Sequence, residues 1–114
     1  MREVCFLIGT DGSILWADAS TSASALPDSR ERWEAIWQNR EQLSEIAHSH
    51  PGVPLGFSAE DESTMAALTQ ALGRALRFSV VAPNGVVVRQ NGVDVVVEKE
   101  PWWAGLLRMA SGMR

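Results

Sequence analysis

The chain has 114 residues, of which 46% are hydrophobic and 21% charged, and its formal net charge is −4. This length and composition predict one compact domain and argue against a disordered chain. The acidic balance argues against nucleic acid or an anionic membrane as the main partner, since both attract clusters of Lys and Arg.

The compartment is predicted from what the sequence does not contain. No apolar run reaches the roughly 18 residues of a membrane-spanning helix, and the first apolar stretch is too short for a secretory signal. The single cysteine, Cys5, cannot form a disulfide within the chain. We therefore expect a cytoplasmic protein.

The first part of the sequence predicts a β-hairpin followed by a loop. Residues 3–9 and 13–18 are apolar runs of strand length, and the turn sequence Thr-Asp-Gly separates them. Trp16, in the second run, is predicted to lie in the core. Residues 19–29 are small and polar, which is typical of a loop.

Residues 29–46 predict an amphipathic helix that begins at Asp28 or Ser29 as its cap. The apolar residues near helical spacing are Trp33, Ile36, Trp37 and Leu43. We expect the two tryptophans to pack in the core. Glu41 and Glu45 are predicted to lie on a solvated helix face.

The middle of the chain predicts a strand, a loop and a second helix. Residues 44–50 read as a short buried strand, and residues 51–57 hold two prolines and two glycines, which indicate a loop. Residues 58–76 predict a helix. Its apolar stripe consists of Met65, Leu68, Leu72 and Leu76.

The last part predicts a three-stranded meander and a terminal helix. Residues 78–98 carry two Asn-Gly pairs between valine-rich runs, which favour tight hairpin turns. Residues 101–110 predict a helix with Pro101 in its first turn. Neighbouring side chains on a helix diverge by about 100°, so we expect Trp102 or Trp103 to be exposed and available to a partner.

The only two histidines, His48 and His50, are one residue apart. Alternate residues of a strand point to the same face, so their imidazoles are expected side by side. Asp61 follows in the first turn of the next predicted helix. Two imidazoles and one carboxylate supply three protein ligands, which is the number in a catalytic zinc site with an open position for water.

Such a site also needs a general base, which is commonly a carboxylate. Glu41 and Glu45 are close to the histidines in sequence, whereas Glu3 lies on the first predicted strand. Spacing alone leaves these three alternatives open. Cys5 is two residues from Glu3 and lies on the same face of the predicted strand, so its thiol could approach a metal. We favour the alternative that Cys5 is a small, buried hydrophobic residue.

Simpler interpretations of this stretch also exist. The two histidines are consistent with ordinary hydrogen-bonded side chains, and Ser58 with Asp61 forms a capping-box sequence that needs no metal. The H-x-H pattern also occurs in other metal hydrolases, including phosphoesterases. No glycine-rich phosphate cradle supports that last alternative.

The spacing of these residues resembles a family signature. His48-Ser49-His50, seven further residues, then Ser58 and Asp61 match the pattern H-S/T-H-x7-S-x-x-D of the JAMM metalloproteases, also called the JAB or MPN domain family. The first segment, EVCFLIG, is similar to the strand on which this family carries its glutamate.

The resemblance implies a fold and a set of roles. The fold would be α/β, with a central, mostly antiparallel mixed sheet flanked by helices in a layering similar to that of cytidine deaminases. His48, His50 and Asp61 would be the zinc ligands. Glu3 would be the general base that deprotonates the zinc-bound water, and the Ser58 hydroxyl would help to stabilise the oxyanion.

The resemblance also implies an activity and partners. It predicts a zinc metalloprotease that hydrolyses a peptide or isopeptide bond near the C-terminus of a ubiquitin-like modifier or a sulfur-carrier protein. The alternative is a non-catalytic interaction module of the same family. Residues 1–114 would form one domain without the helix that usually precedes the glutamate strand, so we expect a homodimer or a partner chain to cover that face.

Overall fold

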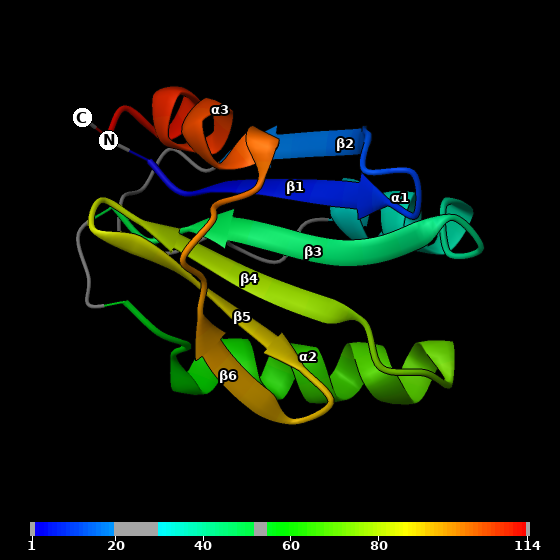
Figure 1. Ribbon diagram of the computed structural model, residues 1–114. Helices are drawn as coiled ribbons and strands as arrows, with labels where there is room; N and C mark the ends of the chain where they lie inside the picture. The colour runs from blue at the N-terminus through cyan, green and yellow to red at the C-terminus, as the bar shows by residue number, and fades with distance from the viewer. Residues whose placement is uncertain (1, 20–29, 52–54, 114) are drawn as a thin grey trace.

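The computed structural model describes residues 2–19, 30–51 and 55–113. They form one six-stranded sheet in the order β2-β1-β3-β4-β5-β6 with three helices (Figure 1). The strands are β1 (Val4–Gly9), β2 (Ile14–Ala19), β3 (Leu43–Ser49), β4 (Arg77–Ala82), β5 (Gly85–Gln90) and β6 (Val93–Val96). The helices are α1 (Arg30–Gln38), α2 (Ala59–Leu72) and α3 (Trp102–Ser111). Only β3 and β4 pair in parallel, which confirms the predicted α/β fold with a mostly antiparallel mixed sheet.

The sheet separates two apolar layers. Alternate side chains of β1 point to opposite faces: Val4 and Phe6 pack against α3, whereas Cys5 and Leu7 face α1 and α2. Figure 1 shows α3 on one face of the sheet and α1 and α2 on the other. Cys5 is therefore a buried core residue, and burial raises the pKa of its thiol to about 12.

The predicted hairpins are present. β1 and β2 form the first hairpin, and β4, β5 and β6 form the meander. The β5–β6 turn has positive φ at Asn91 and Gly92, 53° and 76°, as a tight turn of the primed type requires. The β4–β5 turn lies one residue earlier than the Asn-Gly pair suggests, because Gly85 already pairs with Ala82.

The predicted helix over residues 29–46 is too long. α1 ends at Gln38, and Leu43 is the first residue of β3. The chain leaves the helix where the Asn39 side-chain amide donates to the carbonyl of Ala35. The prediction counted Leu43 among the apolar residues of the helix. It therefore assigned the wrong residues to the helix face that packs on the core. The predicted caps, Asp28 and Ser29, lie outside the described residues.

The two tryptophans of α1 were predicted to pack in the core, and this is wrong. Ala35 and Ile36 are buried instead, while Trp33 and Trp37 are 37% and 55% exposed. The Trp37 ring lies under the guanidinium of Arg40, at 4.0 Å, which shields one side of the ring without burial. Trp16 is half-buried and packs against the edge of the core.

The two other predicted helices are present, but their bounds differ from the prediction. α2 ends at Leu72 and not at residue 76, because Gly73 caps it in the left-handed conformation at φ 71°. Pro101 is the N-cap of α3 and does not belong to its first turn. Met65 and Leu68 of α2 are buried, as is Leu76 beyond its end, and Leu72 packs partly against them. In α3 the adjacent tryptophans diverge, so that Trp103 is buried and Trp102 is 65% exposed. No helix within the described ranges is long and apolar enough to cross a membrane.

Candidate metal centre

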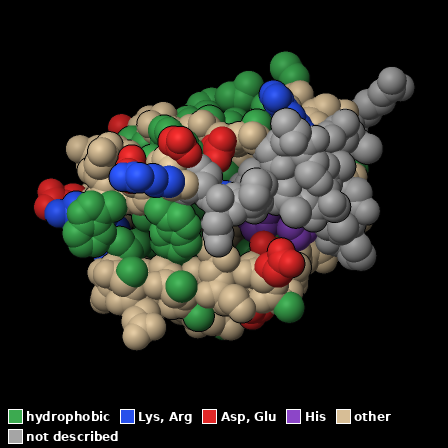
Figure 2. Space-filling model, turned by 180° about the vertical axis from the view of Figure 1, so that it is seen from behind, with side chains coloured by type: hydrophobic (Ala, Val, Ile, Leu, Met, Phe, Trp, Pro, Cys, Tyr) green, Lys and Arg blue, Asp and Glu red, His purple; other side chains and the backbone are tan. Residues whose placement is uncertain are grey.

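The two histidines lie at the carboxyl end of β3. His48 pairs with Cys5 across the antiparallel β1–β3 ladder, so its side chain is on the face that carries α1 and α2. His50 follows the last residue of β3, and its N–H donates to the carbonyl of Val81, which holds the backbone beside β4. In Figure 2 only a small part of the histidine side chains is visible, next to acidic side chains.

Asp61 completes a group of three ligand atoms with these histidines. The two Nε2 atoms are 3.0 Å apart, His48 Nε2 is 3.2 Å from Oδ1 of Asp61, and His50 Nε2 is 3.3 Å from Oδ2. Ligand atoms about 2.0–2.1 Å from a tetrahedral zinc ion lie about 3.3 Å from each other. The separation of the two imidazole nitrogens, and of each nitrogen from its nearer Asp61 oxygen, is therefore compatible with such an ion, and one ligand atom from each residue lies within 4.8 Å of the other two.

The chemistry of the donors also fits a cation. Two neutral imidazoles that approach through the same ring nitrogen must have a proton or a cation between them, because facing lone pairs repel. The Asp61 carboxylate adds negative charge on the same side. His48, His50 and Asp61 are 16%, 6% and 18% exposed in their side chains, so the group is mostly buried.

Asp61 is fixed by the start of α2. Its Oδ2 accepts a hydrogen bond from the N–H of Ser58 at 2.8 Å, and its own N–H donates to the Ser58 hydroxyl oxygen at 3.1 Å. Burial alone would raise the pKa of Asp61, but hydrogen bonds from His48 and His50 reverse this and hold it well below its usual range. The capping box and the metal-ligand arrangement therefore coexist and use the same carboxylate.

Ser58 occupies the N-cap predicted from the sequence. Its oxygen accepts from Asp61, so this bond does not use the hydroxyl hydrogen. The side chain is exposed beside the centre, and donation to a substrate oxygen is compatible with the cap.

Glu3 lies next to the group of His48, His50 and Asp61 without belonging to it. Its Oε1 is 3.6 Å from His50 Nε2, which is beyond hydrogen-bond distance. The residue is 5% exposed. Burial raises the pKa of the carboxyl, and the nearby His50 and His48 partly oppose this shift. A carboxylate with a raised pKa is a better proton acceptor than an ordinary one.

The backbone on both sides of Glu3 is anchored. Arg2 exchanges two hydrogen bonds with Ser111 at the end of α3, with its N–H donating at 2.9 Å and its carbonyl accepting from the hydroxyl at 2.5 Å. The N–H of Val4 donates to the hydroxyl of Ser49 at 2.8 Å. Ser49 stands between the two histidines, so one side chain ties the ligand strand to the Glu3 strand.

Sequence reasoning assigned no role to Ser49, although alternation places it on the face opposite His48. Ser49→Ala should leave the Val4 N–H buried without a partner, which lowers the free energy of unfolding by about 1–3 kcal/mol. We expect faster amide hydrogen exchange at Val4 with zinc binding retained, as measured by NMR and zinc titration. Ser49→Thr keeps the hydroxyl and should behave like wild type.

A matched control for this substitution is Ser44→Ala, which removes a half-buried serine hydroxyl from the same strand. Equal effects of Ser44→Ala and Ser49→Ala on Val4 exchange would contradict the anchoring role of Ser49.

The other two candidates for the base are far from this arrangement. Glu45 was predicted on a solvated helix face, and this is wrong. It is buried on β3, where it pairs with Ile8 on the α3 face and accepts a hydrogen bond from the Ser79 hydroxyl. Glu41 is exposed in the turn before β3, at the opposite end of the strand from His48. Of the three candidate carboxylates, Glu3 is the one that lies beside the histidines.

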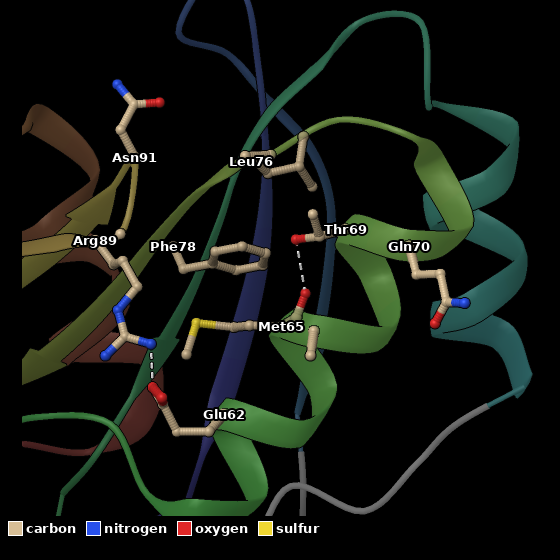
Figure 3. A pocket seen from close by; sticks show the side chains of 11 residues that line it. Glu62, Met65, Thr69, Gln70, Leu76, Phe78, Arg89 and Asn91 are labelled. Atoms are coloured by element: carbon tan, nitrogen blue, oxygen red, sulfur yellow. Dashed lines mark hydrogen bonds and ion pairs between the residues drawn. The ribbon is translucent and has the colours of Figure 1, made fainter.

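A separate pocket of about 540 Å³ lies between α2 and the β5–β6 turn (Figure 3). Met65, Leu76 and Phe78 form its apolar side, while Glu62 and Arg89 form an ion pair at its rim. None of the three ligand residues lines this pocket. Glu62 follows Asp61 in α2, so the pocket and the metal centre share the first turn of one helix.

Comparison with known proteins identifies a family for this chain. A sequence profile of the prokaryotic homologues of the JAB domain (Prok-JAB) matches residues 2–103. The matched range includes Glu3, the two histidines and Asp61. A search of curated proteins gives no significant match.

Proposed function

Because the chain belongs to the family of prokaryotic JAB-domain homologues, we propose that it is a zinc-dependent peptidase of the JAMM type. The observation that carries the proposal is the grouping of His48, His50 and Asp61, whose ligand atoms lie within 4.8 Å of one another, with the buried carboxylate of Glu3 3.6 Å from His50 Nε2. A structural zinc site would instead use four protein ligands.

The residues have separate tasks in this proposal. His48, His50 and Asp61 would hold a zinc ion, which would polarise the scissile carbonyl and lower the pKa of a bound water molecule. Glu3 accepts a proton from the attacking water and delivers it to the leaving amine nitrogen, as the C–O bond forms and the C–N bond breaks. The Ser58 hydroxyl donates to the carbonyl oxygen, which gains negative charge.

We further propose that the substrate is the C-terminal tail of a ubiquitin-like modifier or a sulfur-carrier protein, joined through a peptide or isopeptide bond. The support for this step is the resemblance of the ligand signature to that of the JAMM metalloproteases. A flexible tail is also the part of such a partner that can reach a centre whose ligand side chains are mostly buried.

The test is cleavage of fusions in which such modifiers are joined to a reporter through their C-terminal tails. We expect cleavage by the zinc-loaded protein, loss of cleavage after chelation, recovery with zinc, and none with His48→Ala. Binding of a modifier without cleavage, by wild type and Glu3→Gln alike, would support the non-catalytic interaction module instead.

A further inference from the structure

α3 has apolar side chains on both of its faces. Trp103, Ala104 and Leu107 are buried against the sheet. On the opposite side, Trp102, Leu106 and Met109 are 65%, 42% and 74% exposed. A helix that is apolar all round is normally covered all round, and within the described residues nothing buries this second face.

The exposed face is one continuous stripe. Trp102, Gly105, Leu106 and Met109 follow the i, i+3, i+4, i+7 spacing of a single helix face. The two polar residues of α3 lie outside the stripe and are already bonded. Arg108 forms a two-pronged ion pair with Glu100 and donates to the carbonyl of Ala82, and Ser111 is buried and holds Arg2. The stripe therefore carries no charge that would select a charged partner.

Gly105 lies in the middle of this stripe. A methyl group there would meet no atom within 4 Å, so neither packing within the chain nor a positive φ requires glycine. Glycine inside a helix destabilises it by about 1 kcal/mol relative to alanine. Because glycine has no side chain, it leaves a notch in the helix surface at this position. The backbone or a side chain of another molecule can approach the helix closely there.

The order of residues in the stripe makes it complementary to itself. Trp102 and Met109 are equally distant from the midpoint between Gly105 and Leu106. When two such helices pack antiparallel about that midpoint, Leu106 of each copy faces the Gly105 notch of the other. Trp102 then faces Met109 of the other copy, a favourable contact between an aromatic ring and a thioether. This is the reciprocal pairing of a two-fold interface.

Trp102 is also held in place before any partner binds. Its indole N–H donates to the carbonyl of Gly12 at 3.0 Å, although the ring is largely exposed. A fixed aromatic side chain loses little conformational entropy on association, which is typical of residues that dominate interfaces.

From these observations we propose that the chain forms a two-fold homodimer in which α3 packs antiparallel against α3 of a second copy. In this dimer the exposed stripe on α3 of one copy is covered by the same stripe of the other copy. The dimer proposal is independent of the peptidase proposal, because none of the stripe residues touches the metal centre.

The first test is the mass of the protein in solution, measured by sedimentation equilibrium over a wide concentration range. Wild type should be a dimer, and Leu106→Glu should weaken association by about 30-fold or more, the effect of losing a central interface residue. Val95→Glu is the matched control, since Val95 is an exposed valine of β6 at 54% and should leave the dimer intact. A monomeric wild type, or dissociation by Val95→Glu alone, would overturn the proposal.

The second test concerns orientation and uses disulfide formation. The natural Cys5 is buried, so any disulfide between two copies should involve only the introduced cysteines. A mixture of Trp102→Cys and Met109→Cys proteins should form a mixed disulfide, while each variant alone should not cross-link. Efficient cross-linking of Met109→Cys to itself would indicate parallel helices and overturn the antiparallel arrangement.

Discussion

Glu3→Gln should abolish most hydrolysis while leaving zinc bound. The amide cannot accept a proton from the attacking water, and loss of a positioned general base typically lowers the rate on the order of 100- to 10,000-fold. The substitution removes none of the three ligand atoms, so zinc content should remain near one ion per chain. Turnover of a modifier fusion and elemental analysis of the same sample measure both quantities.

The matched control is Glu41→Gln, which neutralises an exposed carboxylate in the turn before β3. It should retain wild-type turnover. Full activity in Glu3→Gln would show that another group transfers the proton.

The same substitution should change how the stability of the metal-free protein depends on pH. Burial raises the folded-state pKa of Glu3 above its ordinary value of 4.5. The contribution of Glu3 to stability is thus fully present below the unfolded pKa and is lost as pH rises through the raised folded value. Glu3→Gln has no such loss, so the free energy of unfolding of the variant minus that of wild type should grow between the unfolded and the folded pKa and then level off, as measured by urea titration.

Asp61→Ala is expected to remove the metal. The variant keeps two imidazoles and loses the carboxylate that contacts both, so bound zinc should fall from about one ion per chain to nearly none. It also loses half of the capping box of α2, which should lower the free energy of unfolding by about 1 kcal/mol. Elemental analysis and urea unfolding measure the two effects.

Two further variants separate ligation from capping. Asp61→Asn keeps an oxygen that can accept from Ser58, so α2 should keep its stability while zinc binding weakens. Glu60→Gln changes the neighbouring acidic residue of the same turn and should change neither quantity. Zinc bound normally by Asp61→Ala would contradict the assignment of this carboxylate as a ligand.

The group of His48, His50 and Asp61 could be predicted because the residues that form it belong to two short sequence patterns. His48 and His50 are one residue apart, and the capping sequence of Ser58 and Asp61 fixes where α2 begins. Once a loop returns the chain, the helix start meets the strand end, as the described geometry shows. The meander could be predicted equally well, since the two Asn-Gly pairs mark its turns.

The errors arose where distant parts of the chain decide the local structure. The helix over residues 29–46 was extended through Leu43 because its spacing continued the apolar pattern. In the structure the Arg74 side chain, far away in the sequence, donates to the carbonyls of Arg40 and Leu43 and holds the turn and the start of β3. Because the chain is a strand and not a helix at this point, Glu45 lies in the buried sheet and not on the solvated helix face that was predicted.

The placement of Glu3 was open for the same reason. It is held by contacts between residues far apart in the sequence: Arg2 bonds to Ser111, 109 residues away, and Val4 bonds to Ser49, 45 residues away. No local pattern reveals that the C-terminal end of α3 anchors the first strand. The resemblance to the JAMM signature suggested Glu3, and the structure shows what holds it beside His50.

The central claim, an open three-ligand zinc centre, is tested most directly by X-ray absorption at the zinc edge. The protein should be purified without chelators or a histidine tag, and its zinc content determined on the same sample. We predict about one zinc ion per chain, with only nitrogen and oxygen neighbours at about 2.0–2.2 Å. A chain that binds no zinc after reconstitution, or zinc with sulfur at about 2.3 Å, would contradict the centre described above.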